Sequence, residues 1–184
     1  MAGATDQPTF YYDLGSPECY LAAERILAAL PVAPEWEPVR FGVIDADVDR
    51  DAIARRAVEL GLQPLRWPAR WPPDARQAML AATYAKQIGR AVAFSLAAFR
   101  QEFAGGRDLG DEDTMLIAAA ACEMHPTAVL KGISLRSVTA ALEQAGARAR
   151  AAGVHAVPAI QVADRVFQGG RCVEEAALVL GAAV

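Results

Sequence analysis

The residues best suited to chemistry stand near the start of the chain, in the tetrapeptide Ser16-Pro17-Glu18-Cys19. Serine followed by proline and glutamate is an ordinary start of an α-helix, since serine caps free N–H groups, proline fits the first turn and the acid offsets the helix dipole. The same N–H groups and the positive end of the dipole also favour a bound anion, such as a thiolate. The tetrapeptide alone leaves both interpretations open: a plain helix start, or an active site.

In the second interpretation, Ser16 has no histidine beside it in the sequence that would make it an acylating nucleophile. We therefore expect its hydroxyl to donate a hydrogen bond to the sulfur of a bound small thiol and to lower the pKa of that thiol. Cys19 has no cysteine partner at position 16, so we expect an inert, half-buried residue, with monothiol redox chemistry as the alternative. Glu18 would oppose a nearby thiolate and could contact a cationic amine of a cosubstrate.

The elements that must position these residues follow from the hydrophobic pattern. A buried strand is predicted over residues 9–14 and a helix over 16–30, which Pro31 and Pro34 end. A second strand is predicted over 35–41. A strand, a helix and a strand in this order indicate a βαβ unit with parallel strands.

The middle of the chain, from residue 45 to about 130, is rich in alanine and predicts helices, interrupted by a proline-dense loop over 63–74. Helices are expected over 75–104, with a bend near Gly89, and over 111–124. A helix over 136–152 then leads to a hairpin of strands 159–162 and 165–167 and to a closing helix from Cys172.

Composition excludes several classes of protein. With 184 residues, 54% of them hydrophobic, the chain suits one domain, with or without an insertion, and its net charge of −4 does not favour nucleic-acid binding. No apolar run approaches the ~20 residues of a membrane span, and residues 1–10 lack the features of a signal peptide, so we expect a cytoplasmic protein. The three cysteines, Cys19, Cys122 and Cys172, are too few and too scattered for a disulfide framework. Cys122 and His125 alone do not make a zinc site, so no metal is expected.

Several motifs occur in a particular order. The segment Asp13-Leu14-Gly15-Ser16-Pro17-Glu18-Cys19-Tyr20-Leu21 is followed by "LRWPARWPPD", "EFAGGRDLGDED", "GVHAVPAI" and "RVFQGGR". This order resembles the DsbA-like branch of the thioredoxin fold, which has a D-x-x-C-P-x-C-Y-L type segment at its reactive site. Because serine replaces the first cysteine, the chain resembles the 2-hydroxychromene-2-carboxylate isomerases and the kappa-class glutathione transferases. The similarity runs from Phe10 to about Leu180.

The resemblance implies a fold and an activity. The fold is α/β, thioredoxin-like (βαβ…αββα), with residues 8–44 and 135–184 in the thioredoxin-like domain and 45–134 as an inserted all-helical domain. The activity is a thiol-dependent isomerisation or transfer on a small conjugated, aromatic substrate. The cofactor is glutathione or another low-molecular-weight thiol. The resemblance makes Ser16 the catalytic residue.

Other site residues also come from the resemblance. In the family the bond before the matching proline is cis, which would turn the backbone of Val157 toward a peptide-like ligand; the residues alone leave cis and trans open. Asp74 stands where many relatives have asparagine, and Gly170 where many have aspartate, so a thiol other than glutathione stays open. The expected thiol-binding residues are Pro17, Val157, Pro158, Asp74, Gly170 and Arg171.

Weaker candidates have two interpretations each. Trp67, Arg70 and Trp71 either pack the insertion onto the core or bind an aromatic carboxylate substrate. His155 is either an exposed bystander or a general acid or base. Phe94, Leu96, Phe99 and Phe103 are core residues or line a cleft.

Two rival hypotheses for the whole protein stay open. The first is a thiol–disulfide oxidoreductase that uses Cys19. The second is a non-catalytic thioredoxin-fold binding module. A homodimer is compatible with each hypothesis.

Overall fold

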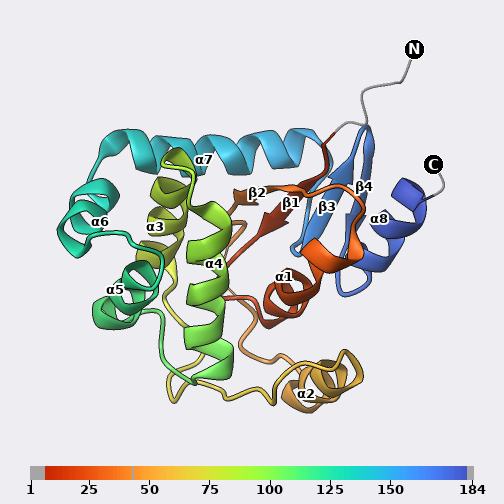
Figure 1. The fold of residues 1–184 in the computed structure, drawn as a ribbon, viewed down its shortest axis with the longest axis horizontal. Helices are drawn as coiled ribbons and strands as arrows, with labels where there is room; N and C mark the ends of the chain where they lie inside the picture. Colours follow the sequence, from red (N-terminus) through yellow and green to blue (C-terminus); the bar gives the residue numbers. More distant parts are fainter. Residues whose placement is uncertain (1–6, 43, 182–184) are drawn as a thin grey trace.

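The computed structural model describes residues 7–42 and 44–181, built around a four-stranded mixed sheet (Figure 1). The strand order is β2-β1-β3-β4, with β1 and β2 parallel and the other two pairs antiparallel. The predicted βαβ unit and C-terminal hairpin are thus confirmed. The first two strands are shorter than predicted, because the chain leaves the sheet after Tyr12 and after Pro38. The strands are β1 (Thr9–Tyr12), β2 (Glu35–Pro38), β3 (Ala159–Val162) and β4 (Arg165–Gln168).

Helices cover both faces of this sheet. Helices α1 (Pro17–Ala29) and α8 (Cys172–Gly181) lie on the face to which β1 directs Phe10 and Tyr12. Helix α7 (Arg136–Ala151) lies on the opposite face, where Tyr11 packs with alanine side chains of α7. The alternation of side chains along β1 therefore places Phe10 and Tyr12 on one side of the sheet and Tyr11 on the other.

The helical segment between β2 and α7 differs in detail from its prediction. The helix expected over 75–104 is two helices, because Gly89 has a positive φ of 73° between them, a conformation that glycine adopts without strain. The helix expected over 111–124 ends at Ala120, and Glu123 has a φ of 60°. A separate helix follows from Pro126. The helices are α2 (Arg50–Glu59), α3 (Arg76–Gln87), α4 (Ala91–Phe99) with the π-helical turn η1 (Arg100–Ala104), α5 (Glu112–Ala120) and α6 (Pro126–Ile133).

These helices share one hydrophobic core with the sheet. Phe94, Phe99 and Phe103 are fully buried, which confirms the core interpretation for them. The hydroxyls of Tyr12 in β1 and Ser95 in α4 are hydrogen-bonded at 2.6 Å. The division into a thioredoxin-like domain and a separate insertion stays a prediction. Within the described ranges, no helix is long and apolar enough to cross a membrane.

Candidate functional site

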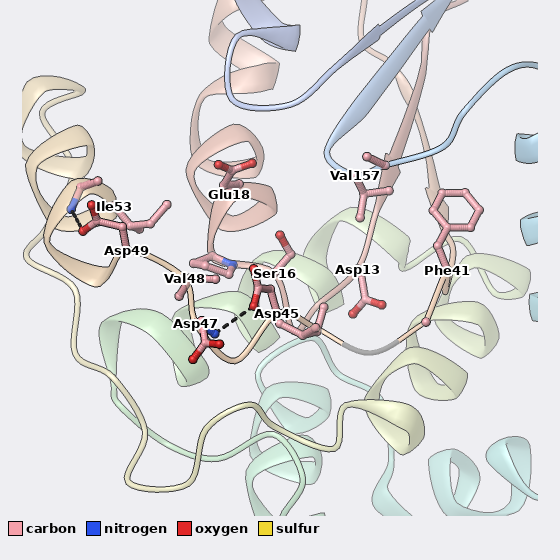
Figure 2. A pocket seen from close by; sticks show the side chains of 15 residues that line it. Asp13, Ser16, Glu18, Phe41, Asp45, Asp47, Val48, Asp49, Ile53 and Val157 are labelled. Carbon is pink, nitrogen blue, oxygen red and sulfur yellow. Dashed lines mark hydrogen bonds between the residues drawn. The ribbon is translucent and has the colours of Figure 1, made fainter.

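A cavity of about 590 Å³ opens at the start of α1 (Figure 2). Three segments form its walls: the loop and first turn around Ser16, the chain from Phe41 to Ile53 that joins β2 to α2, and the two residues before Pro158. Two of these segments follow the carboxyl ends of the parallel strands β1 and β2, the edge at which α/β sheets commonly bind ligands.

Ser16 is the N-cap of α1. Its Oγ accepts a hydrogen bond from the backbone N–H of Cys19 at 3.3 Å, and its own N–H donates to the carbonyl of Asp13 at 3.1 Å. Apart from the buried thiol of Cys19, whose pKa burial raises and the Ser16 hydroxyl lowers, no described residue is placed to accept the hydroxyl proton of Ser16, which is 8% exposed and lines the cavity. This proton is therefore available to a ligand at the positive end of the helix dipole.

The opposite wall is the backbone around Val157. The Val157–Pro158 peptide bond is cis, and Val157 lines the cavity while Pro158 is buried behind it. Gln168 holds this segment, since its Oε1 accepts the N–H groups of His155 and Ala156 at 2.7 and 2.9 Å. In the described structure neither the N–H nor the C=O of Val157 has a hydrogen-bond partner. Both are available to a ligand with a peptide-like backbone.

Asp13 is the most buried acid of the cavity, with 4% of its surface exposed. Its Oδ1 accepts the N–H of Gly15 at 2.9 Å, and no described residue donates to Oδ2. Burial raises the pKa of Asp13 to about 6, against the opposing effects of the Gly15 hydrogen bond and the charge of Arg40. The sequence motif contained Asp13, but its environment was visible only in the structure.

Cys19 lies on the inner side of α1 and does not line the cavity. It is fully buried, not half-buried as we expected, and burial raises the pKa of its thiol far above the ordinary value. A protonated thiol without access to solvent is a poor nucleophile. This environment supports the inert interpretation and argues against monothiol redox chemistry.

The proposed aromatic substrate wall lies elsewhere. Trp67 and Trp71 pack edge to face at 4.9 Å, and both contact the ring of Phe103. The guanidinium of Arg50 stacks on Trp67 at 4.9 Å. Arg70 forms salt bridges with acids of the insertion. None of the three predicted residues lines the cavity, so the structure gives Trp67, Arg70 and Trp71 packing and surface contacts and does not place them in the site.

The remaining predicted residues are near the cavity or outside it. Asp74 is exposed, and its Oδ1 accepts the N–H of Arg76 at 3.2 Å, away from the cavity lining. Gly170 and Arg171 line a second cavity, of about 260 Å³, which shares Glu18 with the first. His155 is exposed and contributes only its backbone N–H to the site's support.

Sequence reasoning missed the wall between β2 and α2. Phe41, Ile44 and Ile53 supply its apolar part, and three aspartates its polar part. The signal was present as the run Asp45-Ala46-Asp47-Val48-Asp49, which directly follows a strand predicted to be parallel to the first. Since parallel neighbours end at the same edge, this run had to lie beside the start of α1.

The arrangement of the sheet, its covering helices and the cavity at the start of α1 define a thioredoxin-like α/β protein. The family model of the DSBA-like thioredoxin domain matches residues 9–180, and the chain therefore belongs to this family. A search of curated proteins by sequence finds no match.

Solved structures with the same fold are similar over nearly their whole length. A 2-hydroxychromene-2-carboxylate isomerase superposes with a TM-score of 0.83 at 18% identity, over 95% of this chain and 94% of that chain. A probable DsbA oxidoreductase from Streptomyces coelicolor has a TM-score of 0.77 at 18% identity, over 96% and 89%. The cytosolic disulfide reductase DsbM from Pseudomonas aeruginosa, solved with GSH, has a TM-score of 0.70 at 15% identity, over 96% and 98%.

Proposed function

We propose that this protein is an enzyme that binds a low-molecular-weight thiol at the start of α1 and stabilises its thiolate with the hydroxyl of Ser16. The reaction is a thiol-dependent isomerisation or transfer on a small conjugated substrate. The observation that carries the proposal is the hydroxyl of Ser16, which lines the cavity at the helix N-terminus and has no acceptor among the described residues other than the protonated thiol of Cys19. The resemblance to an isomerase structure, and a neighbour solved with GSH, support it.

The residues present fit a bound thiol. The cavity of about 590 Å³ lies in the range of ~300–1,000 Å³ that is usual for small-molecule sites. The free N–H and C=O of Val157 offer two hydrogen bonds that orient a ligand across from Ser16. A bound thiol supplies a sulfur nucleophile that can add to a conjugated carbonyl compound and either leave again after bond rotation or stay as the adduct.

The protein's part in this reaction is to hold and stabilise charge. Ser16 donates a hydrogen bond to the sulfur, and the first-turn N–H groups of α1 add the positive end of the helix dipole, so that the pKa of the thiol falls. Phe41, Ile44 and Ile53 provide an apolar wall that limits the access of water to the reacting atoms.

The two rival hypotheses make different predictions. A redox enzyme that uses Cys19 requires an accessible thiol, and Cys19 is fully buried. Insulin reduction with a Cys19→Ser control tests that hypothesis directly. A binding module without catalysis predicts saturable thiol binding with no turnover, or no thiol binding at this cavity.

The experiment follows isomerisation or adduct formation of a conjugated enone by absorbance, with 2-mercaptoethanol as an uncharged thiol. Ser16→Ala and Ser16→Gly remove the hydroxyl, and Ser16→Thr keeps it. Glycine replaces serine at an N-cap with a loss of only a few tenths of a kcal/mol, so Ser16→Gly separates catalysis from helix capping. We expect both hydroxyl-free variants to lose at least about tenfold in turnover, equal to about 1.4 kcal/mol of transition-state stabilisation, and Ser16→Thr to keep most of it. Turnover that does not depend on the hydroxyl would overturn the proposal.

A further inference from the structure

We propose that the cavity at the start of α1 contains a subsite for an organic cation, so that the thiol or the substrate that enters it carries a protonated amine. The inference concerns the site of the proposed function and names its ligand class, but it does not depend on the role of Ser16. The subsite is formed by five carboxylates that line the cavity, here called the acidic wall: Asp13, Glu18, Asp45, Asp47 and Asp49.

The acidic wall is not neutralised by the protein. Several carboxylates elsewhere in the described chain pair with arginine or lysine, as Glu24 does with Arg100 and Glu37 with Lys86, whereas others on the surface form no salt bridge. In the part of the chain that the structure describes, no salt bridge involves a residue of the acidic wall, and no lysine, arginine or histidine lines the cavity. The cavity is therefore a concentrated negative charge within a protein whose net charge is only −4.

The arginines closest in the sequence or in space do not line the cavity. Arg50 follows Asp49 directly, but its guanidinium stacks on the rings of Trp67 and Trp71. Arg40 affects the pKa of Asp13 but lines a different cavity, beside α3 and α7. Arg56 in the neighbouring cavity pairs with glutamates. Arg171 lines that neighbouring cavity as well.

An independent observation indicates that a donor is missing from the cavity. Asp13 is only 4% exposed as a residue and lines the cavity, and the described residues give its carboxylate a single hydrogen bond, from the N–H of Gly15 to Oδ1. In Figure 2 this carboxylate lies below Val157, and the other four carboxylates of the wall lie to one side of it. A nearly buried carboxylate with one hydrogen bond and no salt bridge is unfavourable when ionised, and an ammonium group in the cavity supplies a second hydrogen bond and the opposite charge.

Two further carboxylates of the wall keep one oxygen for a ligand. Oδ1 of Asp45 accepts the N–H of Asp47 at 2.9 Å, and Oδ1 of Asp49 accepts the N–H of Ala52 at 2.8 Å (Figure 2). These bonds fix the loop and leave the second oxygen of each group free of bonds to the described residues. Within those residues the acids do not form a cluster that could hold a metal ion, and spread single contacts suit an organic cation.

The charge of the wall also decides which thiol fits. Glutathione carries two carboxylates and one ammonium group and is net negative at neutral pH, so the acidic wall disfavours it, whereas a small aminothiol is net positive and brings its thiol to Ser16 and its ammonium group to the carboxylates. The ammonium charge then offsets the effect of the acidic wall on the sulfur, which would otherwise oppose ionisation of the thiol. The absence of basic lining residues is thus consistent with a cationic thiol or substrate and not with an anionic one.

The test measures the affinity of three thiols of similar size by isothermal titration at low salt: cysteamine (positive), 2-mercaptoethanol (neutral) and 3-mercaptopropionate (negative). We expect cysteamine to bind at least about tenfold more tightly than 3-mercaptopropionate, with 2-mercaptoethanol between them, and the difference to shrink as salt is added. Ethanolamine, which has no thiol, should compete with cysteamine.

Variants locate the effect. The double variant Glu18→Gln, Asp45→Asn and the single variant Asp13→Asn should each reduce the preference for cysteamine, whereas Asp113→Asn, on the surface of α5, should not. Equal affinity of the three thiols, tighter binding of the negative one, or no binding of cysteamine would overturn the inference. If affinity falls from cysteamine to 3-mercaptopropionate but turnover does not depend on Ser16, the proposed function is wrong and the cation subsite stands. If turnover depends on Ser16 but the three thiols bind equally, the cation subsite is wrong and the proposed function stands.

Discussion

Replacing Asp13 by asparagine should stabilise the protein while weakening ligand binding. The carboxylate is 4% exposed, and burial raises its pKa from the ordinary 3.8 to about 6. Because the pKa is higher in the folded state, ionisation of Asp13 opposes folding. Its destabilising contribution to the free energy of unfolding is absent below about pH 4, grows as the pH rises, and is complete above about pH 6. The difference of about two pH units corresponds to about 3 kcal/mol.

Asparagine keeps the shape and the Oδ1 acceptor for Gly15 and removes the charge. At pH 7.5 we therefore expect Asp13→Asn to be up to about 3 kcal/mol more stable than the wild type in urea unfolding, or roughly 6–12 °C higher in Tm for a chain of this size. At pH 4 the two proteins should be nearly equal in stability. The comparison between the two pH values cancels the titration of the other groups.

Two outcomes would refute this reasoning. If the asparagine variant is equally stable or less stable at pH 7.5, burial does not destabilise the charge of Asp13. If the variant is more stable but binds cysteamine as tightly as the wild type, Asp13 is not part of the cation subsite. The matched control is Glu102, a fully buried carboxyl outside the cavity, whose pKa burial raises to about 8.

Other residues give sharper and simpler tests. In urea unfolding, Glu102→Gln should become more stable than the wild type as the pH rises from about 4.5 to 8, because burial raises the pKa of the Glu102 carboxyl in the folded protein. Its affinity for cysteamine should be unchanged. Equal stability of the two proteins at pH 9 would contradict this prediction. Cys19 should not react with a thiol reagent in the native protein and should react in urea, and fast native labelling would contradict its burial. Arg70→Ala should leave stability nearly unchanged, because its salt bridges are exposed to solvent, and should leave KM unchanged; a raised KM would restore Arg70 as a substrate ligand. Trp71→Ala should lose about 3 kcal/mol or more of stability, from lost packing, and unchanged stability would contradict its role in the core.

Local sequence signals predicted the frame of the site well. Ser16 and Pro17 begin α1 as their types require, and the Ala163–Asp164 turn joins β3 to β4 in the predicted hairpin. These features depend on residues close in the chain, so the sequence alone determines them. The break at Gly89 was predicted only as a bend, since glycine permits but does not require a positive φ.

Long-range packing explains what the sequence did not predict. Trp67 and Trp71 look the same in a sequence whether they contact a substrate or Phe103, and only the fold shows that Phe103 and Arg50 contact them. Similarly, the aspartates of residues 45–49 are an ordinary charged loop until the parallel pairing of β1 and β2 brings them beside Ser16. The burial of Asp13 arises in the same way.

The most direct test of the account is a crystal structure of the protein with cysteamine bound. We expect the sulfur to lie within hydrogen-bonding distance of the Ser16 hydroxyl, and the ammonium group to lie against the carboxylate of Asp13 and its acidic neighbours. Sulfur bound away from the start of α1, or an ammonium group turned toward solvent, would contradict it.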